Sequence, residues 1–297
     1  MTKDDTPELR WGARQRLEFI EFRLLWEGGV NRADITSYFG VSVPQASNDL
    51  SVYQELAPEN IRYDKSEKRY FATDLFTPLF LKEDAGHYLM QLLSVAEGVS
   101  EPEETWLAGV PSFDIIRMPR RNIDPSIWRV MLRSVRETKS IEIRYQSLSD
   151  SRPKPTWRWI TPHAFGYDGH RWHVRAFCHI DLRFKDFLLP RILKTREIGE
   201  PLAAAQDDYV WNEFTTVIVK PHPGLTEDQQ HVVAMDYGMG KNQLKIDIRL
   251  ALLYYLLKRL NLDFAEDKRP PREQHIVLAN AGEVREALKR AQYQTPK

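Results

Sequence analysis

The chain has 297 residues, enough for two or three domains that each bury a core of their own. Lys and Arg number 42, and so do Asp and Glu, so any affinity for nucleic acid must come from a local excess of positive charge. No apolar run approaches the roughly 20 residues of a membrane helix, the first residues lack the apolar core of a signal peptide, and the single cysteine, Cys178, excludes an internal disulfide and a cysteine-rich zinc site. We therefore expect a cytoplasmic protein without a membrane partner.

The N-terminal part is predicted to contain a helix-turn-helix. Apolar residues recur at helical spacing over residues 8–27, and two glycines follow. Asn31 can cap a short second helix over residues 32–39, which another glycine ends. Ser42 begins a capping-box pattern that would start a third helix over residues 43–56, with proline in its first turn. Helix, glycine turn and second helix with short amides near its start are typical of DNA-binding helix-turn-helix units.

The third helix has two distinct faces. An apolar stripe is predicted to pack on the first two helices and consists of Ala46, Leu50, Tyr53 and Ala57. The other face carries Gln45 and Asn48, whose amides can pair with adenine edges in the major groove, flanked by serines that can reach phosphates. Asp49 is expected on this exposed face as well, where it would repel phosphate.

A charged strand-turn-strand follows and would form a wing. Residues 61–63 and 69–71 read as strands, and positive residues gather in the turn between them. Bulk charge gives no support to DNA binding, because residues 31–70 hold five Lys and Arg against six Asp and Glu. A purely structural helical domain is therefore the alternative. The candidate DNA-binding residues are Ser42, Gln45, Ser47, Asn48, Ser51, Lys65, Lys68 and Arg69.

The next segment is predicted to be a helical linker. Residues 83–97 read as a helix, and proline and acidic residues at 98–104 indicate a loop. Asp124 and Pro125 would open another helix, which reaches about Thr138 and leads to the first strand of a middle domain.

The middle of the chain is basic and aromatic. From Lys139 to Arg196 there are 12 Lys and Arg against 5 Asp and Glu. Residues 141–147 and 171–178 alternate apolar and polar side chains, which predicts half-buried strands with a buried Cys178 thiol. Arginine offers paired donors to phosphate and an aromatic ring stacks on a base, so an anionic ligand suits this domain. Arginines that merely solvate the strand faces are the alternative.

Four short patterns in this stretch match a known family. They are Tyr145-x-Ser147, Arg158-x-Ile160-x-Pro162-His163, Trp172-His173-Val174 and Lys185-x-Phe187-x-Leu189-x-Arg191-Ile192. Together they resemble the WYL-domain transcription regulators, whose namesake tripeptide has Tyr and Leu where this chain has His and Val. The family usually has Arg where Lys185 stands. These departures affect the identity of the ligand more than the fold.

The resemblance implies a small SH3-like or Sm-like β-barrel that senses a ligand, a winged helix before it and an extension after it. It also implies the branch of the family that controls phage-defence operons. Tyr145 and the positive side chains of this stretch would then bind an anionic nucleotide or a short nucleic acid. The candidate effector-binding residues are Tyr145, Ser147, Arg158, His163, Arg171, His173, Arg175, Lys185, Phe187 and Arg191.

The C-terminal part is predicted to be a separate α/β domain. Residues 214–220 are rich in β-branched side chains and read as a strand, a helix begins near Thr226, and residues 243–249 alternate as a second strand. Residues 250–260 would form a helix that is apolar nearly all round and must be covered by its own domain or by a partner chain. A winged helix that reads two half-sites needs a two-fold partner, which favours a dimerisation domain; a core-only role is the alternative.

The sequence therefore predicts an α+β multidomain protein. Its parts would be a winged helix-turn-helix (1–74), a helical linker (75–138), a WYL β-barrel (139–200) and an α/β dimerisation domain (201–297). No glycine-rich phosphate loop, paired metal-binding histidines or nucleophile elbow is present in the sequence, so we expect neither an enzyme nor a metal or cofactor.

The function expected is that of a homodimeric repressor which binds palindromic double-stranded operator DNA and responds to an anionic nucleotide or short nucleic-acid effector. A protein that binds single-stranded nucleic acid and a nucleotide-processing enzyme are the alternatives.

Overall fold

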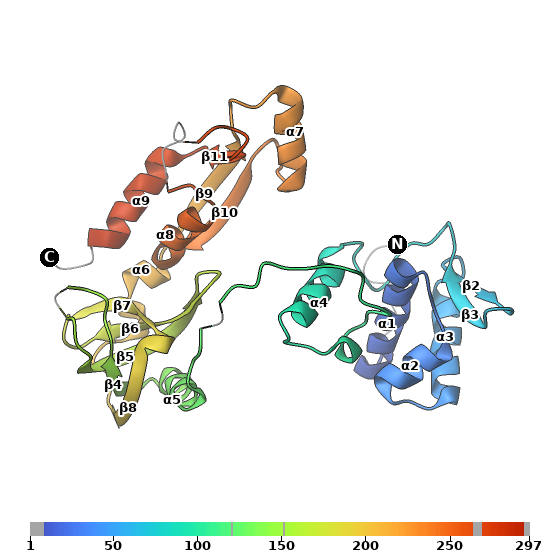
Figure 1. Ribbon diagram of the computed structural model, residues 1–297, viewed down its shortest axis with the longest axis horizontal. Coiled ribbons are helices and arrows are strands. Elements are labelled where there is room, and N and C mark those ends of the chain that lie inside the picture. The colour runs from blue at the N-terminus through green and yellow to red at the C-terminus, as the bar shows by residue number, and fades with distance from the viewer. Residues whose placement is uncertain (1–8, 120, 151, 264–268, 294–297) are drawn as a thin grey trace. The chain divides into compact units, whose positions relative to one another are not determined.

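The computed structural model describes residues 9–119, 121–150, 152–263 and 269–293. Their contacts divide the chain into two units, one up to Met118 and one from Pro119 onward (Figure 1). No helix in the described ranges is long and apolar enough to cross a membrane. The predicted start of the first helix at Glu8 lies outside the described residues.

The N-terminal unit has the helices and the hairpin of a winged helix. A third, unpredicted strand of two residues pairs with the hairpin, in the sheet order β1-β3-β2. The predicted helices and the wing are otherwise confirmed to within a few residues. The elements are α1 (Trp11–Glu27), β1 (Gly29–Val30), α2 (Arg32–Phe39), α3 (Val43–Leu56), β2 (Ile61–Asp64) and β3 (Arg69–Ala72).

Local capping explains why these helices start where they do. The Asn31 side chain accepts a hydrogen bond from the Asp34 amide, and the Asp34 carboxylate accepts one from the Asn31 amide. Ser42 accepts from the Gln45 amide at the start of α3. The Gln45 side chain does not return to Ser42, so the predicted capping box is only half formed there. Gly40, at φ +64°, ends α2 in a conformation that favours glycine.

A buried carboxylate holds the next segment against α1. Glu21, fully buried, accepts hydrogen bonds from the amides of Leu79, Phe80 and Leu81 at 2.6–2.7 Å and from the Tyr53 hydroxyl at 3.0 Å. Burial raises the pKa of Glu21, although these hydrogen bonds oppose the shift. The carboxylate thereby joins the chain that follows the wing to the first helix.

The segment predicted as a linker is divided between the two units. Its first helix, α4 (Gly86–Ala96), packs on α1 through a small apolar cluster of Phe22, Leu92 and Leu107. Its second helix, α5 (Pro125–Arg136), is capped by Asp124 as predicted. This helix packs on the sheet of the second unit with Ile127 and Met131.

The second unit begins with a five-stranded antiparallel sheet in the order β7-β6-β5-β4-β8. One face carries the core, which includes Ile143, Val174 and Phe187, and α5 covers that face. Cys178 is buried in this core, as predicted. No pairing joins β7 to β8 in the described part of the chain, so closure into the expected barrel is not confirmed. The strands are β4 (Ser140–Tyr145), β5 (Thr156–Tyr167), β6 (Trp172–Cys178), β7 (Arg183–Leu188) and β8 (Ile192–Gly199).

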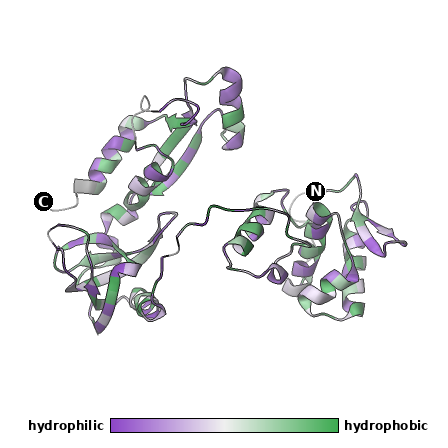
Figure 2. Ribbon diagram, viewed as in Figure 1, coloured by the Kyte–Doolittle hydropathy of each residue, from purple (hydrophilic) through white to green (hydrophobic). Residues whose placement is uncertain are grey.

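The C-terminal domain is a second antiparallel sheet, in the order β10-β9-β11, with helices beside it (Figure 1). The expected strands and helices up to residue 260 are confirmed. The terminal strand and helix were not predicted, because β11 is only three residues long and α9 is mostly polar; Figure 2 shows β9, by contrast, as largely hydrophobic. The elements are α6 (Tyr209–Asn212), β9 (Phe214–Pro221), α7 (Glu227–Asp236), β10 (Leu244–Arg249), α8 (Leu250–Arg259), β11 (Ile276–Leu278) and α9 (Ala281–Tyr293).

The apolar helix α8 is largely covered within its own domain. Leu250, Leu253 and Leu257 are buried with residues of β9 and α9. Tyr254 stays half exposed on the other side. The core of the domain therefore explains most of the apolar character of this helix.

Candidate nucleic-acid interface and effector site

Helix α3 turns one side to the core and the other to solvent. Ala46, Leu50 and Tyr53 are fully buried, whereas Asn48 and Ser51 are exposed. Ser42, at the N-cap, is exposed as well. A helix with exposed short polar side chains near its N-terminus has the geometry needed to enter a major groove.

The expectation that Asp49 lies on this exposed face is wrong. Asp49 is 3% exposed and forms an ion pair with Arg16 of α1, with Nε–Oδ2 at 2.6 Å. Its other oxygen accepts a hydrogen bond at 2.9 Å from the side chain of Gln45. The carboxylate therefore does not face a DNA phosphate, and it restrains one of the two candidate base-reading amides.

The serines on α3 already donate along the helix. Ser47 and Ser51 each donate to the carbonyl four residues earlier, of Val43 and of Ser47. Their hydroxyl oxygens can still accept a hydrogen bond. The guanidinium of Arg32, exposed at the start of α2, lies 3.5 Å from the Ser47 hydroxyl. Arg32 is therefore a further phosphate-binding candidate beside α3, which its place at the start of a short helix does not reveal in the sequence.

The candidates on the wing differ in how freely they project. Lys65 and Lys68 lie in the turn between β2 and β3 and are exposed. Arg69 donates to the carbonyl oxygen of Gly29 at 2.7 Å and lies 3.6 Å from the Asp34 carboxylate. Arg69 therefore holds the wing against α2, and the two lysines are the freer positive charges.

The ten effector candidates do not share one site. A first group lies on the core face of the sheet, where the Tyr145 and Phe187 rings are 5.0 Å apart and the Lys185 ammonium is 5.9 Å from the Phe187 ring. Arg158 lies over the Tyr145 ring at 5.5 Å. Arg191 is joined to the end of β4 by its carbonyl oxygen, which accepts from the Gln146 amide. Ser147 bonds to Ser149 in the loop that follows, at 3.0 Å.

Arg158 is the unusual member of this group. It pairs across strands with Ile143 and is only 2% exposed. Its Nη2 donates to the Thr156 hydroxyl at 2.6 Å, but its Nε finds no hydrogen-bond partner, and no carboxylate pairs with it among the described residues. Burying a guanidinium without an anion is costly, so this position is suited to an anionic ligand.

A second group faces the C-terminal domain. Arg175 makes a bidentate ion pair with Asp208, at 2.7 and 3.0 Å, and His163 lies 2.9 Å from the same carboxylate. Asp186 lies 3.3 Å from Arg175. Burial opposes ionisation of Asp208, but the hydrogen bonds from His163 and Arg175 are strong enough to lower its pKa. Two of the candidate effector residues are thus already engaged in joining the sheet to the domain that follows.

A third group closes the hairpin between β5 and β6. Arg171 and His173 both contact the Asp168 carboxylate, at 2.9 and 3.0 Å. The His173 ring also lies 5.1 Å from the ring of Tyr255 on α8. Burial acts against ionisation of Asp168, yet its hydrogen bonds, led by the one from His173, lower its pKa.

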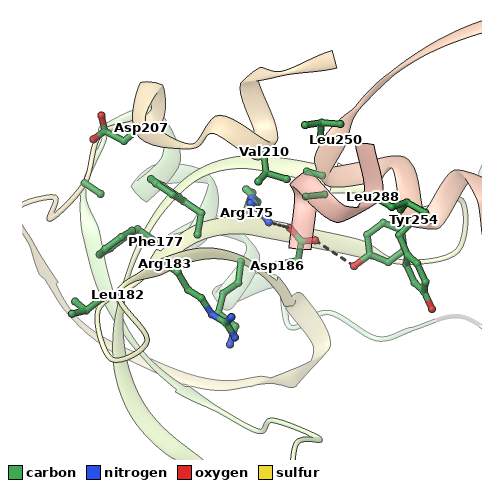
Figure 3. A pocket seen from close by; sticks show the side chains of 16 residues that line it. Arg175, Phe177, Leu182, Arg183, Asp186, Asp207, Val210, Leu250, Tyr254 and Leu288 are labelled. Carbon is green, nitrogen blue, oxygen red and sulfur yellow. Dashed lines mark hydrogen bonds and ion pairs between the residues drawn. The ribbon is translucent and has the colours of Figure 1, made fainter. Parts of the chain in front are cut away.

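A cavity of about 660 Å³ separates the outer face of β6 and β7 from α8 and α9 (Figure 3). Its walls carry apolar and aromatic side chains, such as Phe177, Tyr254 and Leu288, together with charged ones, such as Arg175 and Arg183. Asp186 lies at its edge, where one oxygen accepts from Arg175, as a dashed line in Figure 3 shows, and the other accepts from the hydroxyl of Tyr255. No group of three or more His, Cys, Asp or Glu side chains placed to hold a metal occurs in the part of the chain that the structure describes.

Comparison with known families assigns all three domains. Residues 12–94 match the winged helix-turn-helix domain of the BrxR transcriptional regulator. Residues 126–197 match the WYL domain, and residues 214–284 match the C-terminal dimerization domain of the BrxR regulator. The order of these matches along the chain is the order of the domains described above.

Relatives match over nearly the whole chain. A DNA-binding transcriptional repressor CapW of Stenotrophomonas maltophilia is 37% identical over 292 residues, covering 97% of this chain and 96% of its own length. CapW repressors of Escherichia coli (strain KTE188) and Pseudomonas aeruginosa are 40% and 39% identical, and each comparison covers 94% of this chain and 93% of the relative. The chain therefore belongs to the family of WYL-domain transcriptional regulators that includes the CapW repressors.

Proposed function

We propose that this protein is a homodimeric transcriptional repressor that binds double-stranded operator DNA. The observation that carries the proposal is α3, which exposes Asn48 and Ser51 while its opposite side is fully buried. Kinship with repressors over nearly the whole chain and a C-terminal domain matched to a dimerization domain support it. A two-fold dimer places two such helices on half-sites about one helical turn apart, so the operator is expected to be palindromic.

At the operator, we assign base recognition first to Asn48. Its exposed amide offers a donor and an acceptor, the pair that adenine presents in the major groove. Gln45 can read a second base only by giving up its hydrogen bond to Asp49. Lys65, Lys68 and the serine hydroxyls would bind phosphates and position the helix without reading sequence.

We further propose that an anionic nucleotide or short nucleic acid binds at Arg158. Arg158 is buried and lacks an anionic partner among the described side chains, and it lies over the ring of Tyr145, which in turn contacts the ring of Phe187. Lys185 belongs to the same site, although Asp181 neutralises it at 2.9 Å. A phosphate next to Arg158 would supply the missing negative charge.

The signal from this site would pass through the sheet to the dimerisation domain. Arg175 on β6 holds Asp208, which in turn caps α6 at the start of that domain. An effector that binds one arrangement of the dimer better than another changes operator affinity by the same free energy. No catalytic step is part of this mechanism.

Titration of the full-length protein against the duplex upstream of its own gene tests the proposal. Asn48→Ala is expected to weaken binding to the cognate duplex by about 1–3 kcal/mol and to leave binding to a scrambled duplex nearly unchanged. Gln243→Ala, which removes an exposed amide in the C-terminal domain, is the matched control. Equal binding of wild-type protein to cognate and scrambled duplexes, or a preference for single strands, would contradict the assignment.

A further inference from the structure

Helix α5 carries a row of arginines on the side turned away from the sheet. Arg129, Arg133 and Arg136 are four and three residues apart, so they lie on one side of the helix, and all three are exposed. Ile127 and Met131 are buried on the opposite side. These three arginines, which we name the α5 arginine row, extend for about 10 Å along the helix axis.

Little negative charge balances this row. From Arg117 to Arg136 the sequence holds six arginines and one acidic residue, Asp124, which hydrogen-bonds to the amide and hydroxyl of Ser126. Arg129 and Arg136 make no ion pair with any residue that the structure describes. Arg133 pairs with Glu137 at 2.9 Å, but both side chains are about half exposed or more, and such pairs contribute little.

The surroundings of the row favour a polyanion over a protein surface or a membrane. The helix positions beside it are occupied by Pro125, Ser126 and Glu137, all exposed, and by one half-buried apolar side chain, Leu132. The centre of a protein interface is usually aromatic and apolar, and a membrane-binding helix buries a large apolar face, whereas the apolar face of α5 is already packed on the sheet. Duplex DNA, with one negative charge per about 1.7 Å, matches a row of arginines that has a single, half-buried apolar neighbour.

The winged helix by itself has little positive charge for contacts with the DNA phosphates. Residues 31–70 hold five Lys and Arg against six Asp and Glu, and Arg69 is engaged by Gly29 and Asp34. Most protein–DNA hydrogen bonds nevertheless go to the phosphates and sugars. A repressor with this winged helix therefore benefits from positive charge elsewhere on the chain.

We propose that the α5 arginine row binds the phosphate backbone of the operator beside the half-site contacted by α3. The inference rests on the proposed DNA-binding function and adds a second, sequence-independent contact to it. The described residues from Pro111 to Asp124 form no helix or strand, and an extended segment of that length spans up to about 45 Å. The connection is thus long enough for both contacts to reach one duplex.

Salt dependence of operator binding tests the inference. The triple variant Arg129→Gln, Arg133→Gln, Arg136→Gln is made in the full chain and titrated with a labelled operator duplex that keeps about ten flanking base pairs on each side. Each lost phosphate contact reduces the magnitude of the slope of log K against log salt by about 0.9, so losing three contacts should reduce it by about 2.7 per protomer, or about 5 for the dimer. Affinity at 0.15 M salt should fall about ten- to a hundredfold, while the ratio of operator to scrambled-duplex affinity should not change.

Two controls separate this contact from loss of charge or of fold. The variant Lys245→Gln, Arg285→Gln, Arg290→Gln removes the same charge from the exposed surface of the C-terminal domain and should bind as wild type. Replacing the three α5 arginines by lysine keeps the charge and should keep the salt slope. Each variant is first checked for an unchanged Tm and oligomeric state.

The inference is overturned if the glutamine triple variant of α5 binds the operator with the wild-type slope and affinity. It is also overturned if that variant loses only affinity for single strands, since the row would then serve another ligand. Failure of the proposed function looks different, because wild-type protein would then not distinguish operator from scrambled duplex and Asn48→Ala would have no effect.

Discussion

Arg158 is expected to lower the stability of the free protein, because its charge is buried without an anion. It is 2% exposed, and among the residues that the structure describes its Nε lacks a hydrogen-bond partner and its single side-chain acceptor is the Thr156 hydroxyl. Replacing buried charged groups by apolar side chains of similar size is often neutral or stabilising by about 1–4 kcal/mol. Arg158→Met, which keeps an unbranched side chain but removes the guanidinium, should therefore raise Tm by up to roughly 15 °C, at about 2–4 °C per kcal/mol.

The same substitution at Arg175 should have the opposite effect. Arg175 is buried too, but it neutralises Asp208, which is fully buried. Arg175→Met leaves that carboxylate with His163 and the Trp211 amide but without its guanidinium, and breaking a buried ion pair from one side costs about 3–5 kcal/mol. The two variants remove the same group from neighbouring strands of one sheet, so each is the control for the other.

Thermal unfolding followed by circular dichroism, with and without added nucleotides and short oligonucleotides, measures both effects. Wild-type protein should gain stability from a ligand that fills the site at Arg158, and Arg158→Met should lose that gain while it keeps operator binding. A lower Tm for Arg158→Met than for wild type would refute the reasoning, because Arg158 would then have a structural partner.

The remaining predictions concern the winged helix and the junction. Arg16→Met leaves the buried Asp49 carboxylate unpaired and should destabilise the N-terminal unit by about 3 kcal/mol, measured by chemical denaturation, whereas Arg16→Lys should restore part of the loss. Lys65→Ala and Lys68→Ala should each weaken binding to cognate and scrambled duplexes alike and lower the salt slope by about 1; a sequence-dependent loss would instead place these lysines on bases. Because the pKa of Asp208 is lowered in the folded state, its contribution to stability is present above the unfolded pKa of about 4 and is lost as the pH falls through the folded pKa. Asp208→Asn should accordingly lose stability at neutral pH and show a weaker dependence on pH below 4; an unchanged acid profile would count against the ion pair.

Local signals were sufficient for much of the fold. Asn31, Ser42 and the glycines after the first two helices mark the helix ends of the winged helix within a residue or two, because capping acts between residues close in sequence. Alternation along β6 predicted correctly that the Cys178 thiol is buried in the core.

Ion-pair partners far apart in sequence explain what the sequence could not reveal. Asp49 looked exposed because nothing near it in sequence suggests Arg16, which lies 33 residues away. Arg175 looked available for a ligand because its partner, Asp208, also lies 33 residues away and belongs to the segment that begins the next domain. Positive charge along the chain therefore predicted a basic domain, but not which of its arginines are already neutralised.

The contacts of Glu21 have a consequence for how the N-terminal unit opens. One carboxylate accepts hydrogen bonds from the amides of Leu79, Phe80 and Leu81. Separating that segment from α1 would therefore leave the carboxylate and three backbone amides without these hydrogen bonds at the same time. Helices α1, α2 and α3 and the segment leading to α4 should consequently unfold as one cooperative unit. Amide hydrogens at positions 79–81 are then expected to exchange only when the whole unit opens, as slowly as those in the middle of α1.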